Sequence, residues 1–147
     1  MRIAFLINYN PSSWLGGTNV IKNLIYCIKI FSKKKIDPVL IVKKSLSKND
    51  TKYFKNIKLI KTNLFDQNLF SRILIKLEIL IFGKSRKIDN FLKKNNIKLI
   101  SHSNVLAFNF FTGKRSAIKC LSWIADFQYL YYPKYFKYNT KFLRNLN

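Results

Sequence analysis

Two patterns of apolar residues alternate along this chain. Near-continuous apolar runs of strand length lie at about residues 2–8, 38–42, 57–60, 97–100 and 117–122. Between them, apolar residues recur at helical spacing over about residues 18–33, 68–82 and 86–94. Strands that are apolar on both faces are typical of parallel sheets covered by helices on both sides. The pattern therefore predicts an α/β fold with a doubly wound, mostly parallel, Rossmann-like sheet and helices on both faces.

The length favours a single domain. The chain has 147 residues, of which 48% are hydrophobic, enough for one core. We predict one Rossmann-like domain over residues 1–137 and a polar, basic tail over residues 138–147. The apolar runs, such as the one around Leu77 to Phe82, are far shorter than the roughly 20 residues that span a bilayer, and no signal-peptide cleavage site follows residues 1–8. We therefore expect a cytoplasmic protein without a targeting segment.

The formal net charge of +22 suggests a polyanionic partner. However, Lys, Asn and Ile make up well over a third of the chain, and all three have A/T-rich codons, so biased genome composition also explains the charge. The cations are spread out, and no Arg-rich tract interleaves aromatic residues, which makes nucleic acid an unlikely partner. If the basic surface is functional, we expect peripheral contact with the anionic inner surface of a membrane.

The helix predicted around residues 70–84 is the candidate for such a contact. Arg72, Lys76 and Lys84 alternate there with large apolar residues, so cations border an apolar stripe. Two alternatives remain open: the stripe packs on the sheet, or the helix lies at a membrane interface and binds lipid weakly and in a salt-sensitive way.

Cysteines and acidic residues give no sign of a metal site. Cys27 and Cys120 are isolated, without CxxC spacing, so we expect buried thiols rather than a disulfide or a zinc site. The five Asp residues and Glu78 are scattered, and no two lie within four positions of each other. We therefore predict no bound metal and no cofactor.

The first candidate for a binding site follows the first predicted strand. Gly16 and Gly17 precede the first predicted helix, for which Thr18 is a possible N-cap. Glycines allow the backbone to approach a ligand closely, and free N–H groups at a helix N-terminus attract phosphate. The alternative is a plain strand-to-helix turn. The motif is neither GxGxxG nor a Walker A loop, so it indicates neither dinucleotide nor P-loop chemistry.

Two further candidates follow later strands. His102 is the only histidine and follows the fourth predicted strand, where it can bond a hydroxyl or act as a base; the alternative is a surface role. Asp126 follows the fifth strand, with an Asx turn as its alternative role. It belongs to an aromatic segment at residues 123–133 that also contains Gln128 and Tyr129. Acid, amide and aromatic side chains together suit a polyhydroxylated ligand, whose hydroxyls bond to the polar groups while its apolar faces stack on the rings.

These residues resemble the N-terminal half of GT-B-fold glycosyltransferases of the group 1, or family 4, type. The resemblance covers nearly the whole chain and rests on three features. These are Trp14, Gly16, Gly17, Asn19, Asn23 and Leu24 near the start, His102, and the Trp123-Ile-Ala-Asp-Phe-Gln128 element followed by Pro133 and Phe136. Ala125 stands where that pattern usually has a proline.

The resemblance implies a metal-independent enzyme of two domains that transfers a sugar from a nucleotide-sugar to a saccharide or lipid-linked acceptor. It implies that Gly16, Gly17 and Thr18 face the donor diphosphate, that Trp14, Gln128 and Tyr129 contact the acceptor, and that His102 and Asp126 are catalytic. The second, donor-binding domain is absent from this sequence. The resemblance therefore implies that the chain alone is inactive. It implies a truncated gene product, a split one with a separate C-terminal half, or one domain of a larger enzyme. The alternatives are a non-catalytic module that binds a glycan, an anionic lipid or a partner, and less plausibly a nucleic-acid-binding protein.

Overall fold

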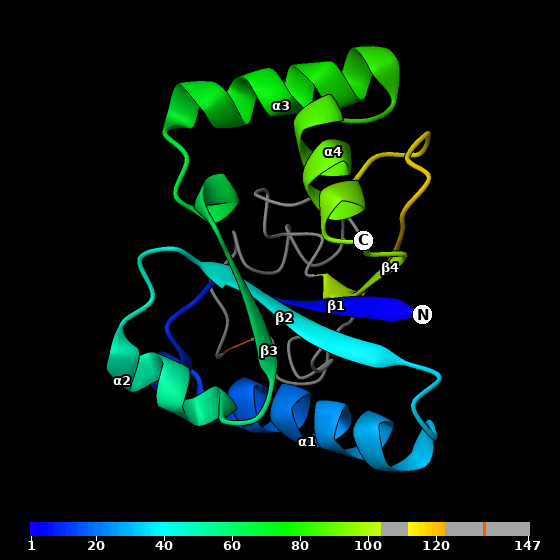
Figure 1. The fold of residues 1–147 in the computed structure, drawn as a ribbon. Coiled ribbons are helices and arrows are strands. Elements are labelled where there is room, and N and C mark those ends of the chain that lie inside the picture. Colours follow the sequence, from blue (N-terminus) through cyan, green and yellow to red (C-terminus); the bar gives the residue numbers. More distant parts are fainter. Residues whose placement is uncertain (104–111, 123–133, 135–147) are drawn as a thin grey trace.

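The chain folds around a five-stranded sheet in which every described pair of strands is parallel (Figure 1). The structure is a computed structural model and describes residues 1–103, 112–122 and 134. The strands are β1 (Arg2–Ile7), β2 (Asp37–Lys43), β3 (Lys58–Thr62), β4 (Leu99–Ser103) and β5 (Lys119–Ser122), in the order β3-β2-β1-β4-β5. The predicted Rossmann-like α/β fold is confirmed.

The central strand β1 divides the sheet into two halves. It pairs with β2 from Arg2–Asp37 to Ile7–Val42, and with β4 from Ile3–Leu99 to Phe5–Ser101. The chain builds β2 and β3 on one side of β1 and then returns to build β4 and β5 on the other side. The direction of winding therefore reverses between β1 and β4.

One face of the sheet is covered by α1 (Leu15–Phe31) and by the short helices α2 (Lys48–Thr51) and η2 (Lys52–Phe54), as Figure 1 shows. The apolar spacing of α1 brings Ile21 and Ile25, one turn apart, into the core. The residues that form this layer of the core are Ile3, Phe5, Ile7, Ile21, Ile25, Leu40, Val42, Leu46 and Phe54.

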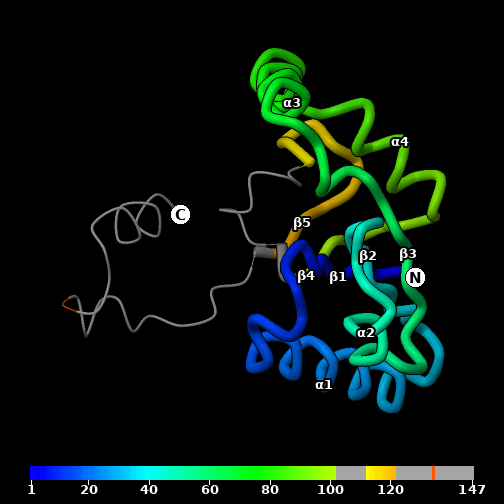
Figure 2. Tube along the Cα trace, turned by 90° about the vertical axis from the view of Figure 1, so that its left-hand side faces the viewer, coloured from blue at the N-terminus to red at the C-terminus, as the bar shows by residue number. Residues whose placement is uncertain are grey.

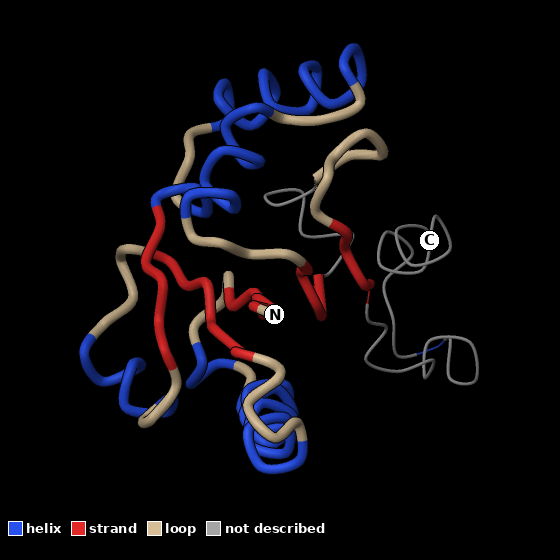
Figure 3. Tube along the Cα trace, turned by 45° about the vertical axis from the view of Figure 1, so that its right-hand side comes forward, coloured by secondary structure: helices blue, strands red, loops and turns tan. Residues whose placement is uncertain are grey.

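The opposite face is covered by α4 (Arg86–Lys94) and by η3 (Asn63–Phe65), so that the sheet lies between two helical layers (Figure 3). Side chains alternate along a strand, so the strand residues between those of the first core layer point to this side. The buried members of this layer are Ala4, Leu6, Val39, Ile41, Leu64, Phe65, Ile88, Leu92, Ile97, Ile100 and Ile118.

The helix α3 (Leu69–Phe82) lies outside both layers and has no buried residue. Its ends are set locally: Asn68 Oδ1 accepts a hydrogen bond of 2.9 Å from Ser71 N–H, and Gly83 ends the helix with φ of +70°. Figures 1 and 2 both show α3 on the far side of α4 from the sheet. It does not pack its apolar stripe on the sheet, so that alternative is wrong.

No helix among the described residues is both long and apolar enough to cross a membrane. The expectation about cysteines is wrong for Cys27, which is exposed on α1, while Cys120 is half-buried.

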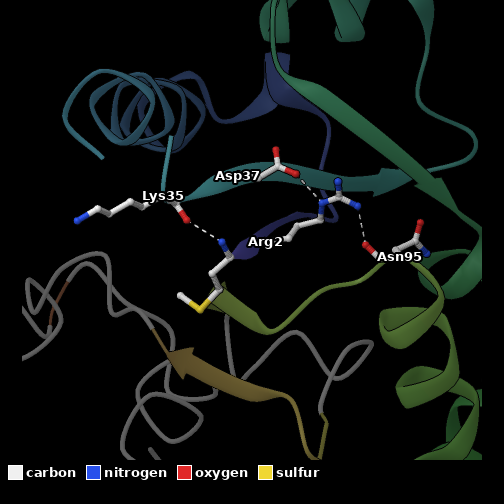
Figure 4. Close-up of polar contacts among 5 residues, drawn as sticks. Arg2, Lys35, Asp37 and Asn95 are labelled. Carbon is white, nitrogen blue, oxygen red and sulfur yellow. Dashed lines mark hydrogen bonds and ion pairs between the residues drawn. The ribbon is translucent and has the colours of Figure 1, made fainter. Parts of the chain in front are cut away.

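The amino edge of the sheet is held by polar contacts of its first residues (Figure 4). Arg2 Nε donates to Asp37 Oδ2 at 2.7 Å, and Arg2 Nη1 donates to the carbonyl of Asn95 at 2.8 Å. The amino group of Met1 donates to the carbonyl of Lys35 at 2.6 Å. One guanidinium thus links β1 to β2 and to the end of α4.

We expect Arg2→Ala to lower the free energy of unfolding by about 1 kcal/mol, because it removes an ion pair and a hydrogen bond to a backbone carbonyl. The effect is modest because the Asp37 side chain is half exposed. Urea unfolding followed by circular dichroism measures it. Lys98→Ala, an exposed position at the same edge, is the matched control, and an equal loss in both variants would contradict a specific role for Arg2.

Candidate functional site

The loops after β1, β4 and β5 leave the sheet at one edge. β1 ends at Ile7 and β4 ends at Ser103, each two residues beyond the Phe5–Ser101 pair. Ser103 pairs in turn with Ser122, the last residue of β5. In open parallel sheets, ligands bind outside the carboxyl ends of the strands, where the winding reverses. This edge is therefore the candidate site.

The connection from β1 to α1 is ordered by backbone bonds. A short 3-10 turn (Pro11–Ser13) follows β1, and Ser13 N–H and Oγ both donate to the carbonyl of Asn10, at 2.9 and 2.7 Å. Ser12 Oγ lies 3.4 Å from Asp50 Oδ1, which links the loop to α2. α1 then begins at Leu15, three residues earlier than we expected.

Gly16, Gly17 and Thr18 consequently lie inside the first turn of α1, and Thr18 is not its N-cap. The cap position is occupied by Trp14. The Thr18 side chain is fully buried, and its hydroxyl lies 2.9 Å from the carbonyl of Trp14 and 3.2 Å from that of Pro11. Thr18 thus fastens the 3-10 turn to the helix, and its hydroxyl bonds to the protein's own carbonyls.

The two glycines have different surroundings. A Cβ at Gly17 would lie 2.6 Å from Cδ2, Cε2 and Cε3 of Trp14, so the indole ring occupies the space of a side chain there. A Cβ at Gly16 would meet nothing within 4 Å. Trp14 remains 43% exposed, and its ring contacts the Tyr9 ring edge-on at 5.2 Å between centroids. Gly17 therefore allows the indole to pack on the helix, whereas Gly16 leaves the start of the helix open.

The N-terminus of α1 presents positive potential to this open space. The first N–H groups of an α-helix have no acceptor within the helix, and the first bond into α1 here comes from Thr18 N–H to Trp14 at 3.0 Å. No side chain of the described residues caps this end, and the first turn contains no acidic residue. The N–H groups of Leu15, Gly16 and Gly17, together with the helix dipole, suit an anion.

Tyr9 is a residue of this edge that sequence reasoning missed. Burial raises the pKa of its phenol above the ordinary value, and the nearby Thr18 hydroxyl offsets part of that rise. The Tyr9 hydroxyl makes no hydrogen bond of good geometry to a described residue. Its position two residues after a buried strand is the sequence signal that could have identified it.

His102 lies within β4 rather than after it, as we had expected. The β4–β5 register shifts between Ser101 and Ser103, so His102 stands at a β-bulge on the ligand-binding edge. Bulges change the direction of a side chain and occur often beside active sites. The side chain of His102, and all of Asp126, Gln128 and Tyr129, lie outside the described residues, so their roles stay predictions.

Metal ligands do not gather in the described part of the chain. No group of three or more His, Cys, Asp or Glu side chains there is placed to hold an ion.

We expect Gly17→Ala to destabilise the fold and Gly16→Ala to leave it unchanged or slightly more stable. The methyl group at residue 17 would displace the indole, a clash that costs about 1–3 kcal/mol. The methyl group at residue 16 meets open space and raises helix propensity by up to about 1 kcal/mol. Thermal unfolding of the two variants compares them directly. Equal stability of both would show that Trp14 does not pack on Gly17 in solution.

Comparisons with known proteins give no relative for this chain. No family model matches it, nor does any curated protein or any solved structure. The Rossmann-like assignment accordingly rests on the strand order and the parallel pairing themselves.

Proposed function

We propose that this chain is the acceptor-side domain of a nucleotide-sugar-dependent glycosyltransferase of the GT-B type. In this proposal, the complete enzyme transfers a sugar to a saccharide or lipid-linked acceptor. The observation that carries the proposal is the uncapped, acid-free N-terminus of α1, with open space over Gly16, directly after the central strand. The resemblance of residues 14–24 and 123–136 to that family supplies the reaction class.

The donor diphosphate is the anion that best suits this helix end. A diphosphate carries concentrated negative charge, and backbone N–H groups bind it without a side chain that must first be ordered. The proposal assigns this contact to the N–H groups of Leu15, Gly16 and Gly17. Thr18 contributes by holding the turn, because its hydroxyl bonds to Trp14 and Pro11.

The acceptor would lie on the aromatic side of the same edge. The Trp14 indole is partly exposed beside the helix start, and sugar rings stack their apolar faces on such surfaces. In the proposal, Gln128 and Tyr129 complete the acceptor contacts, and His102 and Asp126 act on the attacking hydroxyl. The reaction requires no bound metal or cofactor in this scheme and takes place in the cytoplasm, at the inner membrane surface where the acceptor is lipid-linked.

Diphosphate binding tests the helix end separately from catalysis. We expect titration of the ¹⁵N-labelled chain with a uridine diphosphate sugar to shift the amide signals of Leu15, Gly16 and Gly17 most, and uridine alone to shift them little. Gly16→Val should weaken the effect at least tenfold, because its side chain covers the N–H groups. Cys27→Val, exposed three turns further along α1, is the matched control. Shifts spread evenly over lysine-rich surfaces would contradict the proposed site.

Catalysis should require the second domain, because donor and acceptor react only when both walls of the cleft hold them together. We expect the purified chain to show no acceptor-dependent transfer, and a reconstituted two-half enzyme to show it. In that enzyme, His102→Ala and Asp126→Asn should each lower the rate at least tenfold, which is about 1.4 kcal/mol of transition-state stabilisation. Transfer by the chain alone, or unchanged rates in both variants, would refute the assignment.

A further inference from the structure

The outer surface of α3 is apolar to a degree unusual for a helix at the surface of a protein. At about 100° per residue, seven of its large apolar residues occupy a continuous arc of roughly 140°. Four of them are at least two-thirds exposed: Leu69 72%, Phe70 68%, Leu80 81% and Ile81 67%. The arc consists of Leu69, Phe70, Ile73, Leu74, Leu77, Leu80 and Ile81, all of them exposed. Contiguous apolar surface of this kind marks an interaction site.

The helix turns its other side to the protein. Ile75 packs against the core layer beneath α4, and Glu78 Oε1 accepts a hydrogen bond of 3.0 Å from Arg86 N–H at the start of α4. α1 has the opposite arrangement, with Ile21 and Ile25 in the core. The outward direction of the apolar arc is thus fixed by contacts on the inner side of α3.

Cations gather at the C-terminal end of this arc. Gly83 and Gly113 are in close backbone contact, and Arg115 N–H donates to the Gly83 carbonyl at 2.8 Å. This contact brings residues of two separate segments together, and the exposed cations there are Lys84, Arg86, Lys87, Lys114 and Arg115. Arg86 lies over the Phe82 ring, 5.9 Å from its centroid.

The acidic groups of this region are engaged with the protein itself. Glu78 is half-buried and accepts the bond from Arg86, while Asp89 is buried and accepts a bond of 2.8 Å from Ser116 Oγ. The five exposed cations at the end of α3 outnumber these two carboxylates, so this surface has a positive net charge.

We infer that α3 lies flat on an anionic lipid bilayer, with its apolar arc in the boundary between headgroups and acyl chains and the cations at its end on lipid phosphates. An apolar helical face bordered by Lys and Arg is the pattern of helices that bind at such interfaces. The 14 residues of α3 extend only about 21 Å, less than the roughly 30 Å of the hydrocarbon core, so the helix lies in the plane of the membrane.

Net charge favours an anionic membrane over a second copy of the chain as the partner of α3. The chain carries a formal net charge of +22, so two copies repel each other, whereas an anionic membrane attracts the chain. The inference does not depend on the proposed enzymatic activity.

Co-sedimentation of the full chain with vesicles tests the inference. We expect binding to vesicles of phosphatidylglycerol and phosphatidylcholine at 0.1 M salt, and little binding to phosphatidylcholine alone. Binding should fall steeply at 1 M salt, because the Debye screening length shortens from about 10 Å at 0.1 M salt to about 3 Å at 1 M.

Two pairs of matched variants locate the surface. One triple variant removes the apolar arc: Phe70→Ser, Leu77→Ser, Ile81→Ser. It should lower vesicle affinity at least tenfold. Its control at exposed positions of α1 should stay within twofold of the parent chain: Tyr26→Ser, Ile30→Ser, Phe31→Ser.

A second triple variant reverses the cations at the end of α3: Lys84→Glu, Lys87→Glu, Lys114→Glu. It should also lower affinity at least tenfold. Lys22→Glu, Lys48→Glu, Lys55→Glu makes the same change in net charge at exposed positions elsewhere and should lower it less than threefold.

Four results would overturn the inference. These are equal binding to neutral and anionic vesicles, parental affinity in the α3 variant, equal losses in both charge variants, or a dimer in light scattering that the α3 variant dissociates. Circular dichroism checks that each variant is folded. If the triple serine variant does not fold, Leu77→Gln alone replaces it, with Ile30→Gln on α1 as its control.

Discussion

The burial of β1 on both faces is the constraint on which the rest of this structure depends. A strand without a polar face needs helices on either side and a hydrogen-bonded neighbour along each edge, and the order β3-β2-β1-β4-β5 supplies both. Alternate residues of β1 reach the two core layers, Phe5 one and Leu6 the other. The same central position brings the loop after β1 to the point where the winding reverses, so the candidate site is a direct consequence of the core.

The sequence predicted the strands and α4 well because their signals are local. Continuous apolar runs identify buried strands, and α4 spans residues 86–94 as expected. The start of α1 was predicted three residues late, because glycines have low helix propensity and threonine favours caps. Packing of Trp14 on Gly17 and the bonds of Thr18 outweigh those preferences, and neither contact is visible in a pattern of residue types.

Two other features depended on tertiary structure that the sequence does not encode locally. The periodicity of α3 shows that one face is apolar but not which face meets the protein; that choice follows from Ile75 and from the bond of Glu78 to α4. His102 was expected after its strand, and the bulge beside Ser101 extends β4 past it. For the candidate site, the position of the two glycines after the first strand was predictable. Their different roles were not, because they depend on where the Trp14 indole lies.

The contact between Gly83 and Gly113 joins the end of α3 to the segment before β5 through main chain alone. A Cβ at Gly113 would lie 2.3 Å from the Gly83 carbonyl oxygen, so the two backbones meet without intervening side chains, and both glycines have positive φ. A side chain at either glycine would therefore push the end of α3 away from the segment that enters β5.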